Sequence, residues 1–515
     1  MRERKKNFYE EETPEDQWTD IDPEEEELYY EWEEKQERLR RLKEERVRVK
    51  RSIGIMIGLF CVLVVSMAGY ICYYATVHKQ EMFDNSYNGY QAQLQKENIR
   101  GSILASDGTV LAETVTDENG AEKRVYPFEN MFAHAVGYST KGKSGVEALA
   151  NYYLINANVS LPEKVAYQAG EQKIPADNVY TTLDVELQRI AYESLGMYKG
   201  AVIVSEPSTG KILAMVSKPD FNPSTIAENW DTLIQDKNNS TLLNRVTQGL
   251  YPPGSTFKIL TALEYIRENP TTYEQYSFQC TGSYSADGEK IRCYHNTVHN
   301  QVDFTKSFAK SCNSSFANIG MRLDKDEFAK TLDKLMFGED LPIDLPAKQS
   351  HVEVSSEISN GDMMQVVIGQ GTDAMTPLHL NLITNIIAND GYLMKPYLLD
   401  YVENKNHQII KRFEPVSVGT GYMSAEETEA LKAVMQEVVE TGTAKKLSGL
   451  SFSAAGKTGS AEYSQNKEES HAWFTGFAPV DNPQISVTVI IESAGSGGDY
   501  AVPIAKRIME NYLTR

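Results

Sequence analysis

The sequence predicts an α+β fold in which an antiparallel sheet is flanked by helices. Residues 200–205 and 211–217 are two apolar, strand-like runs joined by a turn at Pro207–Gly210, which is typical of a hairpin at the edge of a sheet. A third strand-like run covers Gln484–Glu492, whereas helical patterns dominate the middle of the chain. Strands from both ends with helices between them indicate one large domain over residues 181–515.

The first 51 residues form a charged tail. They hold 18 acidic and 13 basic side chains, within a formal net charge of -21 for all 515 residues. This excess of negative charge argues against a nucleic-acid partner, because phosphate binding needs concentrated Lys and Arg. The acidic run Pro23–Trp32 has no Pro or Gly after its first residue, so we expect it to continue as a helix into the basic segment behind it.

The apolar composition of residues 52–77 predicts a transmembrane anchor helix. The run has no charged residue and is long enough to cross a bilayer, since roughly 20 residues suffice. Eight of the fourteen residues from Arg38 to Arg51 are basic. Basic segments next to a membrane-spanning helix stay in the cytoplasm. We therefore expect a single-pass protein of the cell membrane, with its N-terminus inside and everything after about residue 78 outside. A cleaved signal peptide is the alternative, which the length of the run and of the tail disfavours.

Residues 78–180 predict a small extracytoplasmic domain of mixed structure, which would serve as a pedestal for the larger one. Asn98–Leu104 and Ser106–Ala112 look like two short strands joined at an Asp-Gly turn. Residues 145–154 follow with a helix-like pattern.

The five cysteines do not form a disulfide scaffold, and two of them lie in the apolar anchor run. Cys280 and Cys293 flank a short polar segment whose turn residues, Asp287 and Gly288, would bring two strands together. In an extracytoplasmic domain these two cysteines could form a disulfide, and the sequence leaves that question open. Cys312 is left over.

A Ser-x-x-Lys pair lies near the expected start of a helix. Ser255 precedes Lys258 by three residues, which puts both side chains on one face of the first turn. A lysine held neutral can take the hydroxyl proton, and the backbone N–H of the serine can help to bind an oxyanion. Pro-Pro-Gly at residues 252–254 marks the start, and an apolar helical run follows.

Three other pairs match the same pattern, namely Ser208/Lys211, Ser307/Lys310 and Ser464/Lys467. The first spans a predicted turn and the third lies in a polar loop, so neither offers a helix start that could be buried. The second pair is the serious rival, because a helix is expected there. It lacks a Pro/Gly start signal, however, and its lysine adjoins the next motif. These features favour Ser255 as the nucleophile.

The next motif, Ser311-Cys-Asn313, follows Ser255 by 56 residues. A serine and an asparagine two positions apart on a tight turn can point into one cleft. There the hydroxyl can pass a proton and the amide can hold a carbonyl or amide of a substrate. The pattern is weak by itself, since two other segments match it, Ser86-Tyr-Asn88 and Ser464-Gln-Asn466.

The last motif is a run of small residues around Lys457. A substrate can lie alongside such a strand, with Gly459 leaving room, while Lys457 supplies positive potential and the hydroxyls of Thr458 and Ser460 bind a carboxylate. The three motifs, in this order and within one domain, are the set found in penicillin-binding proteins and class A β-lactamases.

Beyond these motifs the sequence resembles the class B penicillin-binding proteins over roughly residues 95–510. Further segments carry the likeness: Arg100-Gly-Ser-Ile, Asp107-Gly-Thr-Val-Leu-Ala, Thr182-Leu-Asp184, Pro207-Ser-Thr-Gly-Lys-Ile-Leu-Ala, Asn244-Arg245, Gly369-Gln-Gly371, Gly442-Thr443-Ala444 and His471-Ala-Trp-Phe474. The resemblance implies the penicillin-binding transpeptidase fold and peptidoglycan D,D-transpeptidation in cell-wall synthesis. It also implies inhibition by β-lactams, which would acylate the nucleophile as substrate mimics.

The resemblance implies roles for the catalytic residues. Ser255 would attack the D-Ala-D-Ala end of a peptidoglycan stem peptide and release the terminal D-alanine. The acyl group would then pass to an amine of a neighbouring stem. Lys258 would be the base, and Ser311 and Asn313 would serve proton transfer and substrate positioning.

Substrate-binding roles are implied in the same way. Lys457, with Thr458 and Ser460, would bind the terminal carboxylate, and the backbone N–H groups of Ser255 and Ser460 would form the oxyanion hole. The family more often has threonine at the position of Ser460, and the hydroxyl is retained. Cys312 fills the variable middle position of its motif, where its thiol is open to oxidation.

The resemblance points to a polytopic glycan polymerase as a membrane partner and calls for no metal and no cofactor. Three alternatives stay open: a β-lactamase or D,D-carboxypeptidase, a β-lactam sensor, and a non-catalytic scaffold. The single membrane span disfavours a sensor, and the presence of all the motif side chains disfavours a scaffold. A bifunctional class A enzyme is disfavoured because about one hundred residues are too few for a polymerase domain. A septal, elongation or sporulation role is not decided by the sequence.

Overall fold

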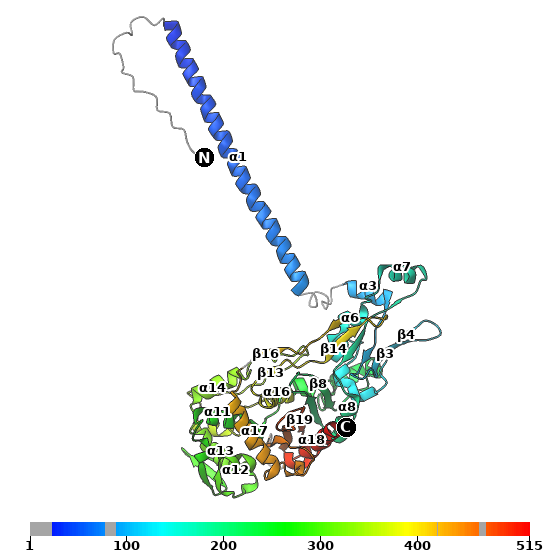
Figure 1. Ribbon diagram of the computed structural model, residues 1–515, viewed down its shortest axis with the longest axis vertical. Coiled ribbons are helices and arrows are strands. Elements are labelled where there is room, and N and C mark those ends of the chain that lie inside the picture. Colours follow the sequence, from blue (N-terminus) through cyan, green and yellow to red (C-terminus); the bar gives the residue numbers. More distant parts are fainter. Residues whose placement is uncertain (1–22, 78–88, 420, 463–469) are drawn as a thin grey trace, which may run out of the picture. The chain divides into compact units, whose positions relative to one another are not determined.

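The computed structural model describes residues 23–77, 89–419, 421–462 and 470–515, and the chain divides into two compact units, residues 1–85 and 86–515. The first unit contains α1 (Pro23–Val77), a single continuous helix (Figure 1). This helix runs from the acidic segment through the basic segment into the apolar run, so the predicted continuation is confirmed. By length and composition α1 is apolar enough to cross a membrane, and the apolar side chains described in that run are exposed.

A five-stranded antiparallel sheet organises the second unit, in the order β17-β18-β19-β7-β8. Its strands are β7 (Gly200–Ser205), β8 (Ile212–Lys218), β17 (Ala455–Glu462), β18 (Ser470–Ala478) and β19 (Ile485–Ile491). The predicted hairpin and the predicted C-terminal strand are confirmed. β19 pairs with both β7 and β18, so it joins the two ends of the domain, and β17 forms one edge.

Helices cover both faces of this sheet. α16 (Pro377–Ala388) packs on β7, β18 and β19, where the hydroxyl oxygen of Thr384 lies 2.6 Å from that of Thr475. α8 (Val185–Leu195) packs on β8, and α18 (Gly497–Leu513) packs on β18 and β19. Every residue of β18 and β19 is buried, which requires cover on both faces because successive side chains of a strand point to opposite sides. The predicted α+β fold is confirmed.

A helical region lies between the two halves of the sheet in the sequence. Its helices are α11 (Lys258–Glu268), α12 (Phe304–Ala309), α13 (Asn313–Gly320), α14 (Lys325–Lys334) and α15 (Asn360–Val366), and α17 (Ala425–Glu440) joins them (Figure 1). α11 is central, because residues 258–266 are all buried and the helix contacts α13, α14 and α17. A helix buried on all sides keeps its side chains away from water, and Lys258 is its first residue.

Two short antiparallel pairs of strands lie beside these helices. β9 (Ser277–Cys280) pairs with β12 (Asn300–Asp303), and β10 (Ser283–Ala286) pairs with β11 (Glu289–Arg292). The predicted Asp-Gly turn joins β10 to β11, so the expected pairing of strands is confirmed.

A six-stranded sheet, in the order β15-β14-β6-β2-β3-β4, combines strands of the segment predicted as a pedestal with two strands from later in the chain. Its strands are β2 (Ile103–Leu104), β3 (Val110–Thr116), β4 (Glu122–Val125), β6 (Asn178–Thr181), β14 (Leu399–Glu403) and β15 (Ile409–Arg412). β2 and β3 are antiparallel, as predicted from the turn between them. Because β14 and β15 come from residues 399–412, the sheet combines segments far apart in the sequence, and the boundary at residue 180 stays a prediction.

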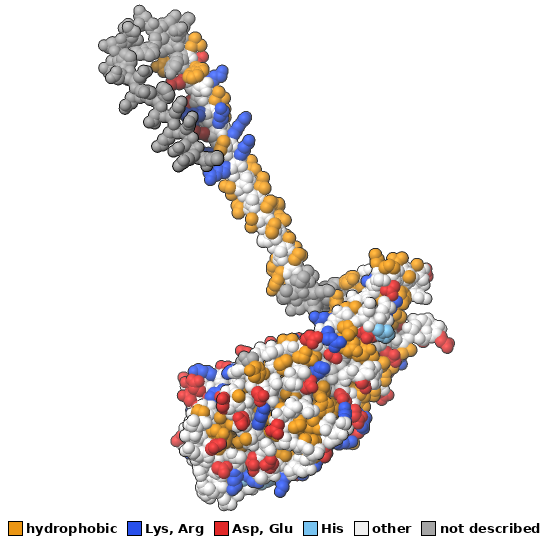
Figure 2. Space-filling view, viewed as in Figure 1, with side chains coloured by type: hydrophobic (Ala, Val, Ile, Leu, Met, Phe, Trp, Pro, Cys, Tyr) orange, Lys and Arg blue, Asp and Glu red, His pale blue; other side chains and the backbone are white. Residues whose placement is uncertain are grey.

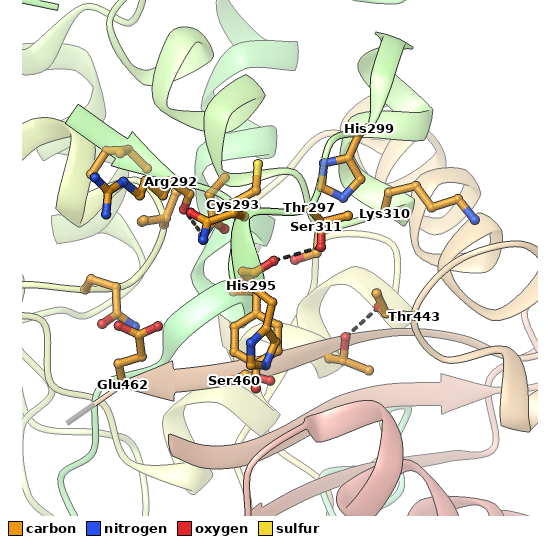
Figure 3. Close-up of a pocket in the computed structure, with 18 of the residues that line it drawn as sticks. Arg292, Cys293, His295, Thr297, His299, Lys310, Ser311, Thr443, Ser460 and Glu462 are labelled. Atoms are coloured by element: carbon orange, nitrogen blue, oxygen red, sulfur yellow. Dashed lines mark hydrogen bonds between the residues drawn. The ribbon is translucent and has the colours of Figure 1, made fainter. Parts of the chain in front are cut away.

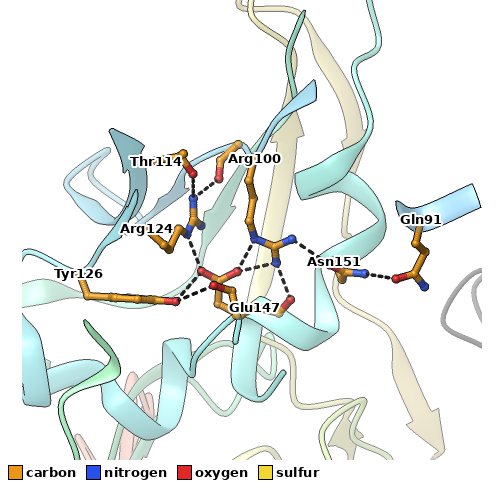
Figure 4. Close-up of polar contacts among 9 residues, drawn as sticks. Gln91, Arg100, Thr114, Arg124, Tyr126, Glu147 and Asn151 are labelled. Carbon is orange, nitrogen blue, oxygen red and sulfur yellow. Dashed lines mark hydrogen bonds and ion pairs between the residues drawn. The ribbon is translucent and has the colours of Figure 1, made fainter. Parts of the chain in front are cut away.

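Glu147 is the centre of a buried ionic network in the pedestal (Figure 4). It lies on α5 (Gly145–Leu149), within the stretch predicted to be helical. Its carboxylate is 2.5 Å from Nη2 of Arg100 and 2.7 Å from Nε of Arg124, and it accepts a hydrogen bond from the hydroxyl of Tyr126 at 3.1 Å. Burial raises the pKa of Glu147, but the two arginines lower it by more, so the group is held ionised.

Candidate active site

Ser255 lies in a short 3-10 turn, η3 (Gly254–Phe257), that leads directly into α11. Gly254 has a φ of 54°, a conformation that favours glycine, and its N–H donates to the carbonyl of Gly369 at 2.8 Å. The indole N–H of Trp473, on β18, donates to the carbonyl of Pro252 at 3.0 Å. The Pro-Pro-Gly segment is therefore held from both sides, and this fixes the position of the serine.

The amine of Lys258 has four oxygen neighbours. Nζ lies 2.9 Å from Oγ of Ser255, 3.0 Å from the carbonyl oxygen of Ser311, 3.2 Å from Oγ of Ser311 and 2.7 Å from Oδ1 of Asn313. Two of these oxygens can only accept hydrogen bonds, and the two hydroxyls can donate. A neutral amine has two N–H groups for the two acceptors and a lone pair for a hydroxyl, which is the arrangement needed to take a proton from Ser255.

Ser311 and Asn313 lie at the turn between α12 and α13. Ser311 has a φ of 56°, which is uncommon for a residue with a side chain, and the turn directs its hydroxyl to the two lysines of the site. Nζ of Lys457 donates to Oγ of Ser311 at 3.0 Å. Nδ2 of Asn313 donates to the carbonyl of Arg292 at 3.1 Å, so the wall of the site holds the amide in place.

Strand β17 brings the other predicted residues to the same place. The hydroxyl oxygen of Thr458 lies 2.6 Å from that of Thr443, and Oγ of Ser460 accepts a hydrogen bond from the N–H of Gly497 at 3.3 Å. There is little room for a side chain at Gly459, because a Cβ there would lie 3.0 Å from the carbonyl oxygen of Pro253. The segment that carries Ser255 therefore packs directly against β17.

These residues line one cavity of about 720 Å³ (Figure 3). The predicted site residues on its wall are Ser255, Ser311, Asn313, Thr458 and Ser460, while Lys258 and Lys457 are buried behind them. Lys290, Arg292 and Lys310 also line the cavity, with Glu462 as an acidic side chain. A mostly basic wall suits a substrate that carries a carboxylate.

Burial governs the charge of both lysines. It lowers the pKa of Lys258 from the ordinary 10.5 to about 8. Burial, and then the charge of Lys258, lower the pKa of Lys457 well below its ordinary value. Two ammonium groups on either side of one serine hydroxyl repel each other, so a bound carboxylate would favour the charged form of the lysine that it touches.

The rival Ser-x-x-Lys pairs have other surroundings. The hydroxyl of Ser307 is buried and donates to the carbonyl of Asp303 at 2.6 Å, while Nζ of Lys310 donates to the carbonyl of Thr441. Ser208 lies in the turn between β7 and β8, as predicted. The matches Ser464/Lys467, Ser464/Asn466 and Ser86/Asn88 lie outside the described residues.

Sequence reasoning missed a set of contacts around Tyr251, four residues before Ser255. Glu492, just after β19, lies 2.7 Å from Nε of Arg245 and accepts a hydrogen bond from the hydroxyl of Tyr251 at 2.7 Å. The ring of His471 packs edge-on against Tyr251, at 5.5 Å between centroids. In the sequence Asn244-Arg245 stands out only as a family motif, because its acidic partner lies more than 240 positions away and leaves no local signal.

The disulfide between Cys280 and Cys293 is not formed. Their Sγ atoms are 3.7 Å apart, far longer than a disulfide bond of about 2.05 Å. Instead Cys312 and His299 lie beside them, and the four ligand atoms fall within 4.8 Å of one another. Three thiols and an imidazole in such a cluster could hold a metal ion.

This sheet with its helices, and the Ser255–Lys258 pair at the cavity, are those of a serine acyltransferase with the architecture of the penicillin-binding enzymes. A family model described as the penicillin binding protein transpeptidase domain matches residues 200–510, and one described as the penicillin binding protein A dimerisation domain matches residues 100–173. The chain belongs to the penicillin-binding protein transpeptidase family, and the class B resemblance seen in the sequence is confirmed.

Individual relatives agree with this assignment. The chain is 29% identical to the peptidoglycan D,D-transpeptidase MrdA of Haemophilus influenzae, over 75% of this chain and 65% of that protein. It is 29% identical to the peptidoglycan D,D-transpeptidase PbpA of Mycolicibacterium smegmatis, over 79% of this chain and 87% of that protein. Among solved structures, the penicillin G acyl-enzyme complex of penicillin-binding protein A from M. tuberculosis has a TM-score of 0.72 and 27% identity, covering 81% of this chain and all of that one.

Proposed function

We propose that this chain is a monofunctional peptidoglycan D,D-transpeptidase that cross-links the cell wall. One observation carries the proposal. The Ser255 hydroxyl, the Lys258 amine, the Ser311 hydroxyl and the Lys457 amine form a continuous series of contacts of 2.9, 3.2 and 3.0 Å. Such a series can take a proton from the nucleophile and deliver it to a leaving group without using water.

Acylation follows from this geometry. Oγ of Ser255 attacks the carbonyl carbon between the two D-alanines as its proton passes to Nζ of Lys258. The backbone N–H groups of Ser255 and Ser460 stabilise the oxyanion. When the C–N bond breaks, the proton moves through the hydroxyl of Ser311 to the departing nitrogen, and D-alanine leaves. In the second half, an amine of another stem attacks the ester carbon, the bond to Oγ breaks, and Ser255 regains a proton.

The edge position of β17 supports the substrate pose. A stem peptide can extend the sheet beside this strand, where its backbone would find hydrogen-bonding partners. Lys457, Thr458 and Ser460 would then face the terminal carboxylate, with Gly459 allowing close approach. A β-lactam offers the same carboxylate and a strained amide, so it would acylate Ser255 in place of the peptide.

Labelling with a fluorescent penicillin tests the nucleophile. The wild-type protein should be labelled, Ser255→Ala should not be, and Ser307→Ala should keep its label. Labelling that survives in Ser255→Ala and disappears in Ser307→Ala would show that Ser307, and not Ser255, is the nucleophile. A second assay supplies a D-Ala-D-Ala peptide together with an acceptor amine. A cross-linked product supports transpeptidation, whereas rapid release of hydrolysed peptide or penicillin would favour the carboxypeptidase or β-lactamase alternative.

The proposed location is the outer face of the cell membrane, with α1 crossing the bilayer and residues 1–51 in the cytoplasm. The basic residues before the apolar run support this orientation. A polytopic glycan polymerase is the proposed partner, since a cross-linking enzyme needs newly made strands. Protease added to intact spheroplasts should remove the catalytic domain and spare the N-terminal tail. If the protease digests the tail and the catalytic domain is protected, the protein has the opposite orientation in the membrane.

A further inference from the structure

Glu462 is the one acidic side chain among the described residues that line the catalytic cavity. The lysine and arginine side chains on the same wall are Lys290, Arg292 and Lys310. On the outer surface seen in Figure 2, by contrast, acidic and basic side chains are intermixed. A single carboxylate on a mostly basic wall therefore marks a particular place in the cavity, and it attracts a different kind of group from the rest of the wall.

The place of Glu462 follows from its strand. It is the last residue of β17, and it comes two positions after Ser460 and four after Thr458. Side chains two positions apart in a strand point to the same face and lie about 6.5 Å apart along it. All three side chains line the cavity, in agreement with this alternation, and Figure 3 shows Ser460 and Glu462 along one strand. Glu462 thus lies beyond Ser460, at the opposite end from Thr458.

The carboxylate of Glu462 is available to a ligand. The residue is half-buried, and its backbone pairs with Ser470 on β18. Within the described part of the chain, its side chain has neither an ion pair nor a hydrogen bond. A ligand that covers this carboxylate removes water from it, which costs free energy unless the ligand supplies a new partner. A ligand that lies on β17 therefore binds best when it presents a hydrogen-bond donor with positive charge at this point.

The direction of the stem peptide on β17 follows from the proposed reaction. There the terminal carboxylate lies at Thr458, and the carbonyl that is attacked lies at the N–H of Ser460. The peptide then runs antiparallel to β17, so its N-terminal part extends toward Glu462. The residue just before D-Ala-D-Ala is the next one along this path, at the end of the strand. A long side chain on that residue can reach the Glu462 carboxylate.

We propose that Glu462 binds a side-chain amine on the residue that precedes D-Ala-D-Ala in the donor stem peptide. This role rests on the proposed function and specifies its substrate class, namely stem peptides with a diamino acid at that position. A primary ammonium is a compact cation with three N–H donors, so it supplies both the charge and the hydrogen bond that the carboxylate needs. A neutral or acidic side chain supplies no such pair.

The basic side chains of the wall add to this selectivity. Lys290, Arg292 and Lys310 repel an ammonium group, whereas Glu462 attracts one. A peptide with a carboxylate at one end and an amine three residues back therefore has one favourable orientation, with the carboxylate at Thr458 and the amine at Glu462. In that orientation the amide between the two D-alanines lies at the nucleophile. Glu462 contacts a remote part of the substrate, so it determines specificity without taking part in bond breaking.

Two peptides that differ in one charge test the site. Both are acetylated at the N-terminus and end in D-Ala-D-Ala, and the preceding residue is lysine in one and ε-acetyl-lysine in the other. The full-length protein in detergent receives each peptide with the same acceptor amine, and release of D-alanine gives kcat/KM. We expect the wild-type protein to prefer the lysine peptide about fivefold, which corresponds to a good ion pair at a partly exposed site.

Substitutions show whether Glu462 causes the preference. Glu462→Gln should bring the ratio of the two kcat/KM values close to one, and Glu462→Lys should reverse the preference. Glu193→Gln, which changes an exposed glutamate on α8, is the matched control and should keep the wild-type ratio. Each ratio compares two peptides on one preparation, so a lower folded fraction does not alter it. A wild-type protein without a preference, or a preference that survives in Glu462→Gln, overturns the proposal.

A second measurement separates the donor from the acceptor. Here the ε-acetyl-lysine peptide is the donor, and the concentration of the acceptor amine is varied. Glu462→Gln should leave the KM for the acceptor as it is in the wild type. If that KM rises while the ratio of the two donor peptides keeps its wild-type value, Glu462 binds the acceptor amine, and the donor assignment is overturned.

Protection from fluorescent penicillin separates this role from the proposed reaction. A peptide bound on β17 slows the labelling of Ser255, and this effect reports binding without any turnover. If the wild-type protein releases D-alanine from neither peptide, the proposed transpeptidation fails, yet the lysine peptide should still protect at about fivefold lower concentration. Equal protection by the two peptides overturns the role of Glu462.

Discussion

The amine of Lys258 lies 2.9 Å from the hydroxyl oxygen of Ser255, and the same amine contacts Ser311 and Asn313. Because Lys258 is fully buried at the start of α11, its charge is expensive to maintain, and burial lowers its pKa to about 8. The proposed nucleophile is thus paired with a proposed base whose amine loses its proton near physiological pH. Several measurable properties depend on this pair and on the packing around it.

Acylation should depend on pH through Lys258. The neutral amine is the form that accepts the proton of Ser255, and its fraction rises as pH increases through about 8. The second-order rate constant for acylation by a β-lactam should therefore increase from pH 6 to pH 9 and level off above that. Stopped-flow labelling across this range measures it. A rate constant that is flat, or that falls with pH, would contradict a lysine base.

Lys258→Arg should slow acylation strongly while keeping the positive charge. A guanidinium does not deprotonate in proteins, so it cannot act as the base. Loss of general base catalysis typically costs about 10²–10⁴-fold in rate. Labelling with fluorescent penicillin measures the loss, and Lys310→Arg, whose lysine lines the same cavity, is the matched control with an expected change of less than about twofold. Full activity in Lys258→Arg would show that Lys258 is not the general base.

Gly369→Ala should disturb the nucleophile segment. Gly369 has a φ of 74°, and a Cβ there would lie 2.1 Å from the carbonyl oxygen of Gly254, next to Ser255. Gly108→Ala is the matched control, because that glycine has a φ of 87° and open space around it. The control should lose about 1–2 kcal/mol of unfolding free energy from the backbone conformation alone. Gly369→Ala should lose more and should also slow acylation, and equal effects in the two variants would refute the close-packing explanation.

Glu147→Gln should destabilise the predicted pedestal segment and leave the rate of acylation unchanged. The change leaves Arg100 and Arg124 without their buried counter-ion, which typically costs about 3–5 kcal/mol. Thermal unfolding measures the loss, and acylation of the protein that remains folded should be unchanged. Glu193→Gln is a suitable control, because the ion pairs of that exposed residue with Arg189 and Arg507 are worth little. A melting temperature equal to that of the wild type would show that the network contributes no stability.

Much of the fold was predictable because its signals are local. The β7–β8 hairpin, the two Asp-Gly turns and the continuous helix α1 each depend on residues within one short segment. Ser255 could be preferred over Ser307 for the same reason, since Pro-Pro-Gly and the apolar run of α11 stand next to it. The pairing of β14 with β6, by contrast, joins residues 399 and 181, and no periodicity in either strand indicates its partner.

The Ser-x-x-Lys motif and its two partner motifs, which follow one apolar segment in the chain, could be found without a structure, because each motif is short and their order can be read directly. The contacts between distant side chains became known only from the folded chain. It placed Glu492 against Tyr251, and it brought Cys280, Cys293 and Cys312 together with His299 instead of pairing two cysteines. Contacts of this kind depend on how helices and strands pack, and packing depends on the whole chain.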